Sequence, residues 1–197
     1  MANVRGKAYA LNVLTPMKPW KSPFLRAAFR LFSLKFTQRE LRALSFIHFA
    51  RWTVISSGNL PKFPEMTRRT VIYYDYLLFE SNFNGSWNEY IDAFHSVLSF
   101  KLNLVWRWSE KFPGSVPLAP FRQYIQRNQI YTDYYYVACP GSTVRDVKNA
   151  LAVVSAFETL VARIDDDNDN FANAYFTFVT GLQNKLGTHG GPGPEMT

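Results

Sequence analysis

Four segments of the chain are rich in aromatic and β-branched residues, which β-strands favour. They cover residues 7–15, 45–55, 71–82 and 131–139. Turn-forming residues follow each segment: Pro16, Ser56-Ser57-Gly58-Asn59, Asn84-Gly85 and Pro140-Gly141. The pattern predicts four strands, with those at 45–55 and 71–82 adjacent in one sheet.

Apolar residues at helical spacing fill most of the intervening sequence. They predict a helix over 23–36, a helix over 86–108, a short helical segment near 120–128, a helix from about 143 to 164 and a last one that includes 171–182. The helix at 86 is the best defined, because Ser86 and Glu89 form a capping box. The order β-α-β-β-α-β, with an extra C-terminal helix, predicts an α+β, ferredoxin-like antiparallel sheet with helices on one face. We expect one domain over 1–186 and a flexible tail over 187–197.

The composition suits a globular domain, since 47% of the 197 residues are apolar and 19% are charged. No apolar run approaches the ~18 residues of a membrane span, and the N-terminus lacks a signal-peptide pattern. These observations predict a cytoplasmic protein. The single cysteine, Cys139, excludes an internal disulfide. The acidic run 165–169 lacks the glycine and the distal glutamate of a calcium loop, so we expect no metal site.

Positive charge is concentrated at the start of the chain. Residues 1–42 hold nine Lys/Arg and one acid, whereas residues 151–197 hold two Lys/Arg and six acids. The amphipathic segment 23–36 suits a helix that packs on a sheet, and it also suits a helix at an anionic membrane surface or a protein partner. The residues of that surface would be Lys21, Arg26, Arg30 and Lys35. We expect no nucleic-acid partner, because no zinc-finger or RNP-like spacing occurs.

Candidate chemistry centres on the 45–55 and 71–82 strands. Strict alternation places His48 and Arg51 on opposite faces, provided the strand has no bulge. Glu80 is the natural partner of Arg51, either as a structural ion pair or as part of a polar cavity with His48. In the second case His48, Arg51 and Glu80 would be catalytic, with His48 transferring a proton or acting as a ligand, and Arg51 with Glu80 and Asn82 orienting the bound molecule. The expected ligand-binding residues are Tyr76, Asn82, Asn84, Tyr134 and Tyr136.

The sequence contains no GxSxG, HExxH, GxxxxGK[ST] or GxGxxG motif. Serine-hydrolase, zinc-protease, nucleotide-binding P-loop and Rossmann functions therefore have no support.

The phrases HFARW (48–52), YDYLLFESNFNGSWNEYIDAF (74–94) and TDYYYVACPG (132–141) resemble an uncharacterised bacterial branch of the dimeric α+β barrel superfamily. Over roughly residues 7–163, this resemblance implies a homodimer and a pocket for a small apolar molecule. It implies oxidative or isomerising chemistry if the protein is an enzyme. The dye-decolourising peroxidases and chlorite dismutases of that superfamily bind heme, which makes a heme-binding peroxidase-like protein an alternative. The turn at 84–89 does not match the GxxDG motif of those peroxidases.

Overall fold

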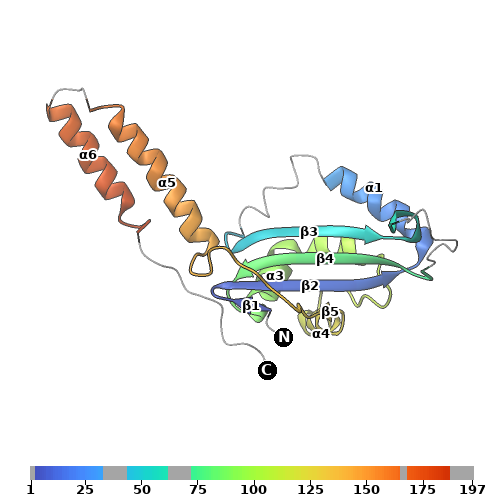
Figure 1. The fold of residues 1–197 in the computed structure, drawn as a ribbon. Coiled ribbons are helices and arrows are strands. Elements are labelled where there is room, and N and C mark those ends of the chain that lie inside the picture. Colours follow the sequence, from blue (N-terminus) through green and yellow to red (C-terminus); the bar gives the residue numbers. More distant parts are fainter. Residues whose placement is uncertain (1–2, 33–43, 62–71, 165–167, 187–197) are drawn as a thin grey trace.

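The computed structural model describes residues 3–32, 44–61, 72–164 and 168–186. A single antiparallel sheet lies at its centre (Figure 1). Its strands are β1 (Val4–Arg5), β2 (Ala8–Met17), β3 (Ile47–Ile55), β4 (Asp75–Asn84) and β5 (Gln129–Ile130). The order is β1-β2-β4-β3, and β5 also pairs with β2. The α+β class is confirmed, and the order β5-β2-β4-β3 is that of a ferredoxin-like sheet.

The helices of the described residues agree with the predicted periodicity. They are α1 (Ser22–Phe32), α3 (Trp87–Trp106), α4 (Leu118–Arg127), α5 (Val144–Val161) and α6 (Asn168–Leu182). Two short 3-10 turns, η1 (Pro19–Lys21) and η3 (Ser57–Asn59), lie between elements. The Ser86–Glu89 capping box forms as predicted, and Thr143 and Asp146 form a second one at the start of α5. The predicted end of the first helix, 33–36, and the tail 187–197 lie outside the described residues.

The core lies between one face of the sheet and helices α1, α3 and α4. Alternate residues of β2 and β4 point into it, including the fully buried Val13 and Leu77. Phe79 packs against Trp106 of α3 with ring centroids 5.3 Å apart. Burying such a side chain contributes about 1.5–3 kcal/mol, so this face carries most of the hydrophobic stabilisation. Helices α1, α3 and α4 therefore cover one face of the sheet, as expected.

The predicted fourth strand, 131–139, is wrong. Only Gln129 and Ile130 pair with β2, at Val13 and Asn12. Residues 3–5 already occupy the adjacent edge of β2, because β1 pairs with Ala8 and Tyr9. The chain therefore leaves the sheet after β5 and crosses its open face obliquely (Figure 1). Directly after β5, a side chain takes the place of backbone strand pairing, since the Thr132 amide donates to Asn3 Oδ1 at 2.8 Å.

The turn between β1 and β2 requires a glycine. Gly6 has φ of 60°, which side-chain-bearing residues rarely adopt. A Cβ atom there would lie 2.1 Å from the carbonyl oxygen of Pro140. The neighbouring Lys7 amide donates to that oxygen at 2.8 Å. The crossing segment is thus held against the first turn of the chain.

Helices α5 and α6 form an antiparallel hairpin that projects away from the sheet (Figure 1). Its root is fixed at the end of β4, where Asn84 Oδ1 accepts a hydrogen bond from the Val144 amide at 2.9 Å. Lys7 and Asp146 add an ion pair at 3.7 Å. The hairpin is therefore anchored at one end.

Candidate ligand-binding cleft

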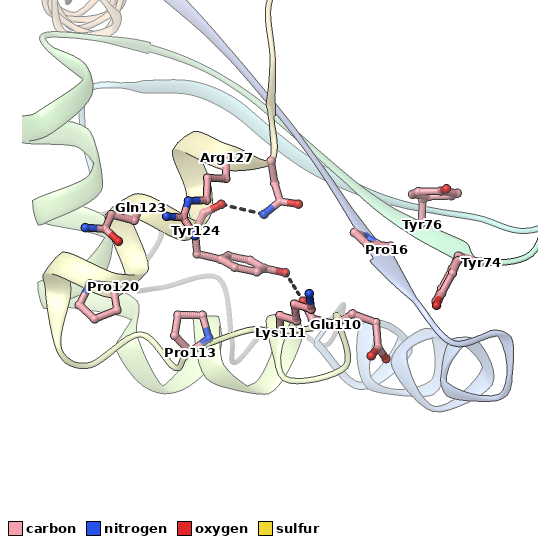
Figure 2. A pocket seen from close by; sticks show the side chains of 11 residues that line it. Pro16, Tyr74, Tyr76, Glu110, Lys111, Pro113, Pro120, Gln123, Tyr124 and Arg127 are labelled. Atoms are coloured by element: carbon pink, nitrogen blue, oxygen red, sulfur yellow. Dashed lines mark hydrogen bonds between the residues drawn. The ribbon is translucent and has the colours of Figure 1, made fainter.

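A cleft of about 650 Å³ opens at the end of the sheet where β2 finishes and β4 begins (Figure 2). The α3–α4 connection and one side of α4 form its other walls. This volume falls in the usual range of small-molecule sites. The lining residues are Pro16, Tyr74, Tyr76, Glu110, Lys111, Pro113, Pro120, Gln123, Tyr124, Arg127 and Asn128.

The connection that forms one wall is tied to the sheet by polar contacts. The Glu110 amide donates to the Pro16 carbonyl oxygen at 2.8 Å. The hydroxyls of Thr15 and Ser109 lie 2.8 Å apart and are buried. From α4, the Tyr124 hydroxyl donates to the Glu110 carbonyl oxygen at 3.3 Å (Figure 2). The cleft is consequently preformed and does not depend on a free loop.

Tyr124 forms the aromatic floor of the cleft. Its side chain is buried, and burial raises the pKa of its phenol to about 12. The hydroxyl therefore stays protonated at physiological pH and acts as a hydrogen-bond donor. Tyr74 and Tyr76 stand across the cleft at the start of β4, so a flat ring could stack between aromatic walls.

Lys111 is the strained residue of the cleft. Its φ of 56° lies in the left-handed region, which costs a non-glycine residue about 1–2 kcal/mol. The contacts of the neighbouring Glu110 hold the backbone in place. Strain of this kind clusters at binding and catalytic sites, where it fixes the direction of a side chain.

The electrostatic balance of the cleft is positive. The Glu110 carboxylate is paired with Lys21 Nζ at 2.8 Å, and that hydrogen bond lowers the pKa of Glu110. Lys111 and Arg127 are exposed and form no side-chain hydrogen bond or ion pair with the residues that the structure describes. Two cations therefore remain available at the cleft for an anionic group.

The predicted Arg51–Glu80 pair exists, with Arg51 Nε 2.6 Å from Glu80 Oε2. The two residues face each other across β3 and β4, on the face that the helices leave open. The Arg51 side chain is 65% exposed, and its pKa is raised by the hydrogen bond to Glu80. The arrangement is a surface ion pair at the edge of the sheet, which corresponds to the structural alternative.

His48 lies at an irregularity of β3, since the pairing register shifts between Ile47 and Phe49. The bulge-free alternation assumed from the sequence does not hold there. The His48 side chain is exposed, yet partial desolvation lowers the pKa of its imidazole, and the neighbouring Asn84 side chain offsets part of this effect. Asn84 itself is buried, and it donates to the Lys7 carbonyl oxygen at 2.7 Å. In the structure Asn84, a predicted ligand-binding residue, instead holds the start of the α5–α6 hairpin by accepting the hydrogen bond of the Val144 amide.

Among the other predicted ligand-binding residues, only Tyr76 lines the cleft. Asn82 donates to the Tyr135 hydroxyl at 2.8 Å, on the open face of the sheet. Tyr134 and Tyr136 point into solvent with exposures of 83% and 73%. The sequence prediction missed Lys111, Tyr124 and Arg127. Their only sequence signal is the proline-rich connection at 113–120, which marks a loop without indicating its partners.

The predicted basic surface is partly used inside the molecule. Lys21 pairs with Glu110, and Arg26 donates to the Val54 carbonyl oxygen at 3.1 Å and thereby holds α1 on β3. Arg30 also has an interaction partner. Lys35 lies outside the described residues.

The described residues contain no group of three or more metal-ligating side chains, and none of their helices has both the length and the apolarity needed to cross a membrane. The lining of the cleft includes no His, Cys or Met side chain. Those residues supply most axial ligands of heme, and the cleft offers only the less common tyrosine ligand, so the heme alternative gains no support here and we derive no step through heme.

In comparisons with protein-family models, curated proteins and solved structures, none matches this chain. The superfamily resemblance therefore stays a prediction that rests on the quoted phrases.

Proposed function

We propose that this protein binds a small organic anion with an aromatic or otherwise flat apolar body in the cleft beside α4. The observation that carries the proposal is the pairing of two available cations, Lys111 and Arg127, with an aromatic and proline-rich floor. From the sequence we expect a small apolar ligand, and the present proposal adds an acidic group to that ligand.

The ligand chemistry follows from the two parts of the lining. Tyr124 and Tyr76 offer ring surfaces, which favour a flat apolar body. Arg127 offers a planar guanidinium that holds a carboxylate or phosphate through two hydrogen bonds. Because Glu110 is neutralised by Lys21, it does not cancel this attraction. Strained Lys111 adds a second fixed charge.

Calorimetric titration with aromatic carboxylates tests the proposal. Benzoate, naphthoate and indoleacetate, each paired with its neutral amide, separate charge recognition from apolar stacking. We expect saturable binding of at least one carboxylate and weaker binding of its amide. Arg127→Gln should raise the Kd about tenfold, since a charge-assisted hydrogen bond contributes about 1.5–3 kcal/mol.

Arg145→Gln is the matched control, because it removes the same charge from an exposed site on α5, near the opposite end of the β2–β4 pair. It should leave the Kd unchanged. Equal affinity for carboxylate and amide, or equal losses in both Arg variants, would contradict the proposal.

A second candidate function is contact with an anionic membrane surface beside α1, favoured by the exposed rings of Trp20 and Phe24. Phe24 stacks on Trp108 at 5.7 Å, so the rings form a rigid cluster. Aromatic rings next to cations suit the headgroup region of a bilayer. Trp20→Ser with Phe24→Ser should weaken sedimentation with phosphatidylserine vesicles. The control Phe100→Ser removes an even more exposed ring from α3 and should have no effect.

A catalytic role of His48 and a homodimer stay predictions from the sequence. His48 lies next to the Asn84 end of β4, whereas the cleft lies at the Tyr76 end. A catalytic His48 would therefore act at a site separate from the cleft, and His48→Ala should leave carboxylate binding at Arg127 unchanged.

A further inference from the structure

The α5–α6 hairpin carries a large apolar surface that nothing in the described chain covers. Its exposed side chains include Leu151 at 66% exposure and Phe176 at 76%. The full set of large exposed apolar residues is Val147, Leu151, Val154, Phe157, Val161, Ile164, Tyr175, Phe176, Val179 and Leu186. Soluble chains rarely leave such a contiguous surface open.

Most of these residues lie on one side of the hairpin, with Leu151 and Phe176 at its outer edges. On α5, Phe157 and Val161 directly follow Ala156 and Leu160, which face α6. We call the row of α5 residues that faces α6 the contact line of α5, and define that of α6 in the same way. Successive residues of a helix are rotated by about 100° about its axis, so Phe157 and Val161 are displaced from the contact line in the same rotational sense.

On α6 the same relation holds, because Tyr175 and Val179 directly follow Ala174 and Phe178, which face α5. The two helices run antiparallel (Figure 1). When two helices are antiparallel, residues that are displaced in the same rotational sense from the contact line of each helix lie on the same side of the pair. Phe157 and Val161 of α5 therefore lie on the same side as Tyr175 and Val179 of α6. Together they form what we call the apolar face.

The opposite side of the hairpin is polar. The residues that directly precede the contact line are Ser155 and Thr159 on α5 and Asn173 and Thr177 on α6. The hairpin is thus a two-helix layer with one apolar and one polar side. A layer of this kind buries its apolar side against another element.

The spacing on α5 is that of a helix-packing seam. Val147, Val154 and Val161 recur every seven residues, and Ala150, Phe157 and Ile164 follow each by three. This is the a/d pattern by which two helices interlock side chains. The seam extends along the whole of α5, and the Thr143 cap and Asn84 hold its first turn in place.

We propose that the apolar face of the hairpin docks on the same face of a second copy of this chain, forming a four-helix bundle between two protomers. Covering its ten large side chains would remove on the order of 1,000 Å² from water on each copy, which meets the roughly 800 Å² per partner of a stable interface. A two-fold axis makes one patch self-complementary, so no other partner is required.

The charge of the hairpin argues against a lipid surface as the occupant. Residues 144–186 contain four Lys/Arg and six Asp/Glu, so the hairpin is acidic where a membrane-binding face is basic. The apolar stripe also lacks the flanking row of cations that anchors such helices.

Sedimentation equilibrium of the full chain at micromolar concentration tests the proposal. The wild-type protein should be dimeric. Val154→Glu with Val179→Glu places two charges at the centre of the apolar face and should raise the dimer Kd on the order of 100-fold or more. Both side chains are exposed in the monomer, so its fold and circular dichroism should be retained.

The control is Ser155→Glu with Thr177→Glu, which adds the same charges on the polar side of the same helices and should leave the dimer intact. Three outcomes would overturn the proposal: a monomeric wild type, a dimer that survives Val154→Glu with Val179→Glu, or equal dissociation in both double variants. A monomer that binds phosphatidylcholine vesicles through Val154 and Val179 would assign the face to lipid.

Discussion

The side-chain oxygen Oδ1 of Asn84 accepts a hydrogen bond of 2.9 Å from the backbone amide of Val144. Asn84 ends β4 and Val144 begins α5, so this bond joins the central sheet to the projecting hairpin. The Asn84 amide group also donates to the Lys7 carbonyl oxygen at 2.7 Å. One buried side chain thus holds the first turn of the sheet and the first turn of the hairpin.

Replacing Asn84 with alanine should lower the free energy of unfolding by about 2–4 kcal/mol, because the buried Val144 amide and the half-buried Lys7 carbonyl oxygen lose their partners. Urea denaturation followed by circular dichroism measures this loss. Asn82→Ala is the matched control, since the Asn82 side chain donates to the partly exposed Tyr135 hydroxyl and to no other group of the described residues. Equal losses in the two variants would show that Asn84 has no special role.

Stability should fall in mild acid through His48. Desolvation lowers the pKa of this histidine below its ordinary value of 6.5, so the unfolded chain binds a proton more readily. The contribution of His48 is complete above about pH 6.5 and is lost as the pH falls through the folded-state pKa. His48→Gln should therefore show a shallower loss of unfolding free energy between neutral pH and about pH 5. Parallel pH curves for the two proteins would exclude this linkage.

Lys111→Gly should stabilise the fold while weakening ligand binding. Glycine adopts φ of 56° freely. Relief of the strain raises the free energy of unfolding, and the greater entropy of glycine in the unfolded chain offsets part of that gain, so we expect a net increase of about 0.5–1 kcal/mol. Thermal unfolding measures the gain, and Lys111→Gln serves as the control that loses the charge but keeps the strain. A lower melting temperature for Lys111→Gly than for Lys111→Gln would refute the strain argument.

Gly6→Ala should be among the most damaging small substitutions. The added Cβ would meet the Pro140 carbonyl group, and the left-handed φ adds strain, so we expect a loss of at least about 2 kcal/mol. Gly58→Ala is the control, because a Cβ at Gly58 meets nothing within 4 Å. Chemical denaturation of both variants should separate them clearly; similar midpoints would contradict the predicted contact.

Local signals accounted for most of the elements. The capping box of Ser86 and Glu89 and the apolar spacing behind it indicated α3. The prediction of a strand at 131–139 is wrong because another segment, β1, pairs with the same edge of β2. The short β1 occupies the edge of β2 that residues 131–139 would need, and Gly6 was its only signal.

The site was less accessible to sequence reasoning than the fold. The Arg51–Glu80 pair was predicted because a charged arginine needs a carboxylate and Glu80 lies on the neighbouring strand, and the register places the two residues opposite each other. Lys111 and Arg127 come from a loop and from the end of a short helix, and neither position has a periodic pattern that relates it to Tyr76. The cleft exists because separate contacts, such as that from Tyr124 to Glu110, bring these segments together.

The most direct test of the account is a calorimetric comparison of Arg127→Gln with Arg145→Gln, using an aromatic carboxylate and its amide. The cleft predicts that the wild type binds the carboxylate in preference to the amide, that Arg127→Gln loses about tenfold in affinity, and that Arg145→Gln loses none. Absence of saturable carboxylate binding, or binding that is indifferent to Arg127, would contradict the assignment of this cleft as an anion-binding site.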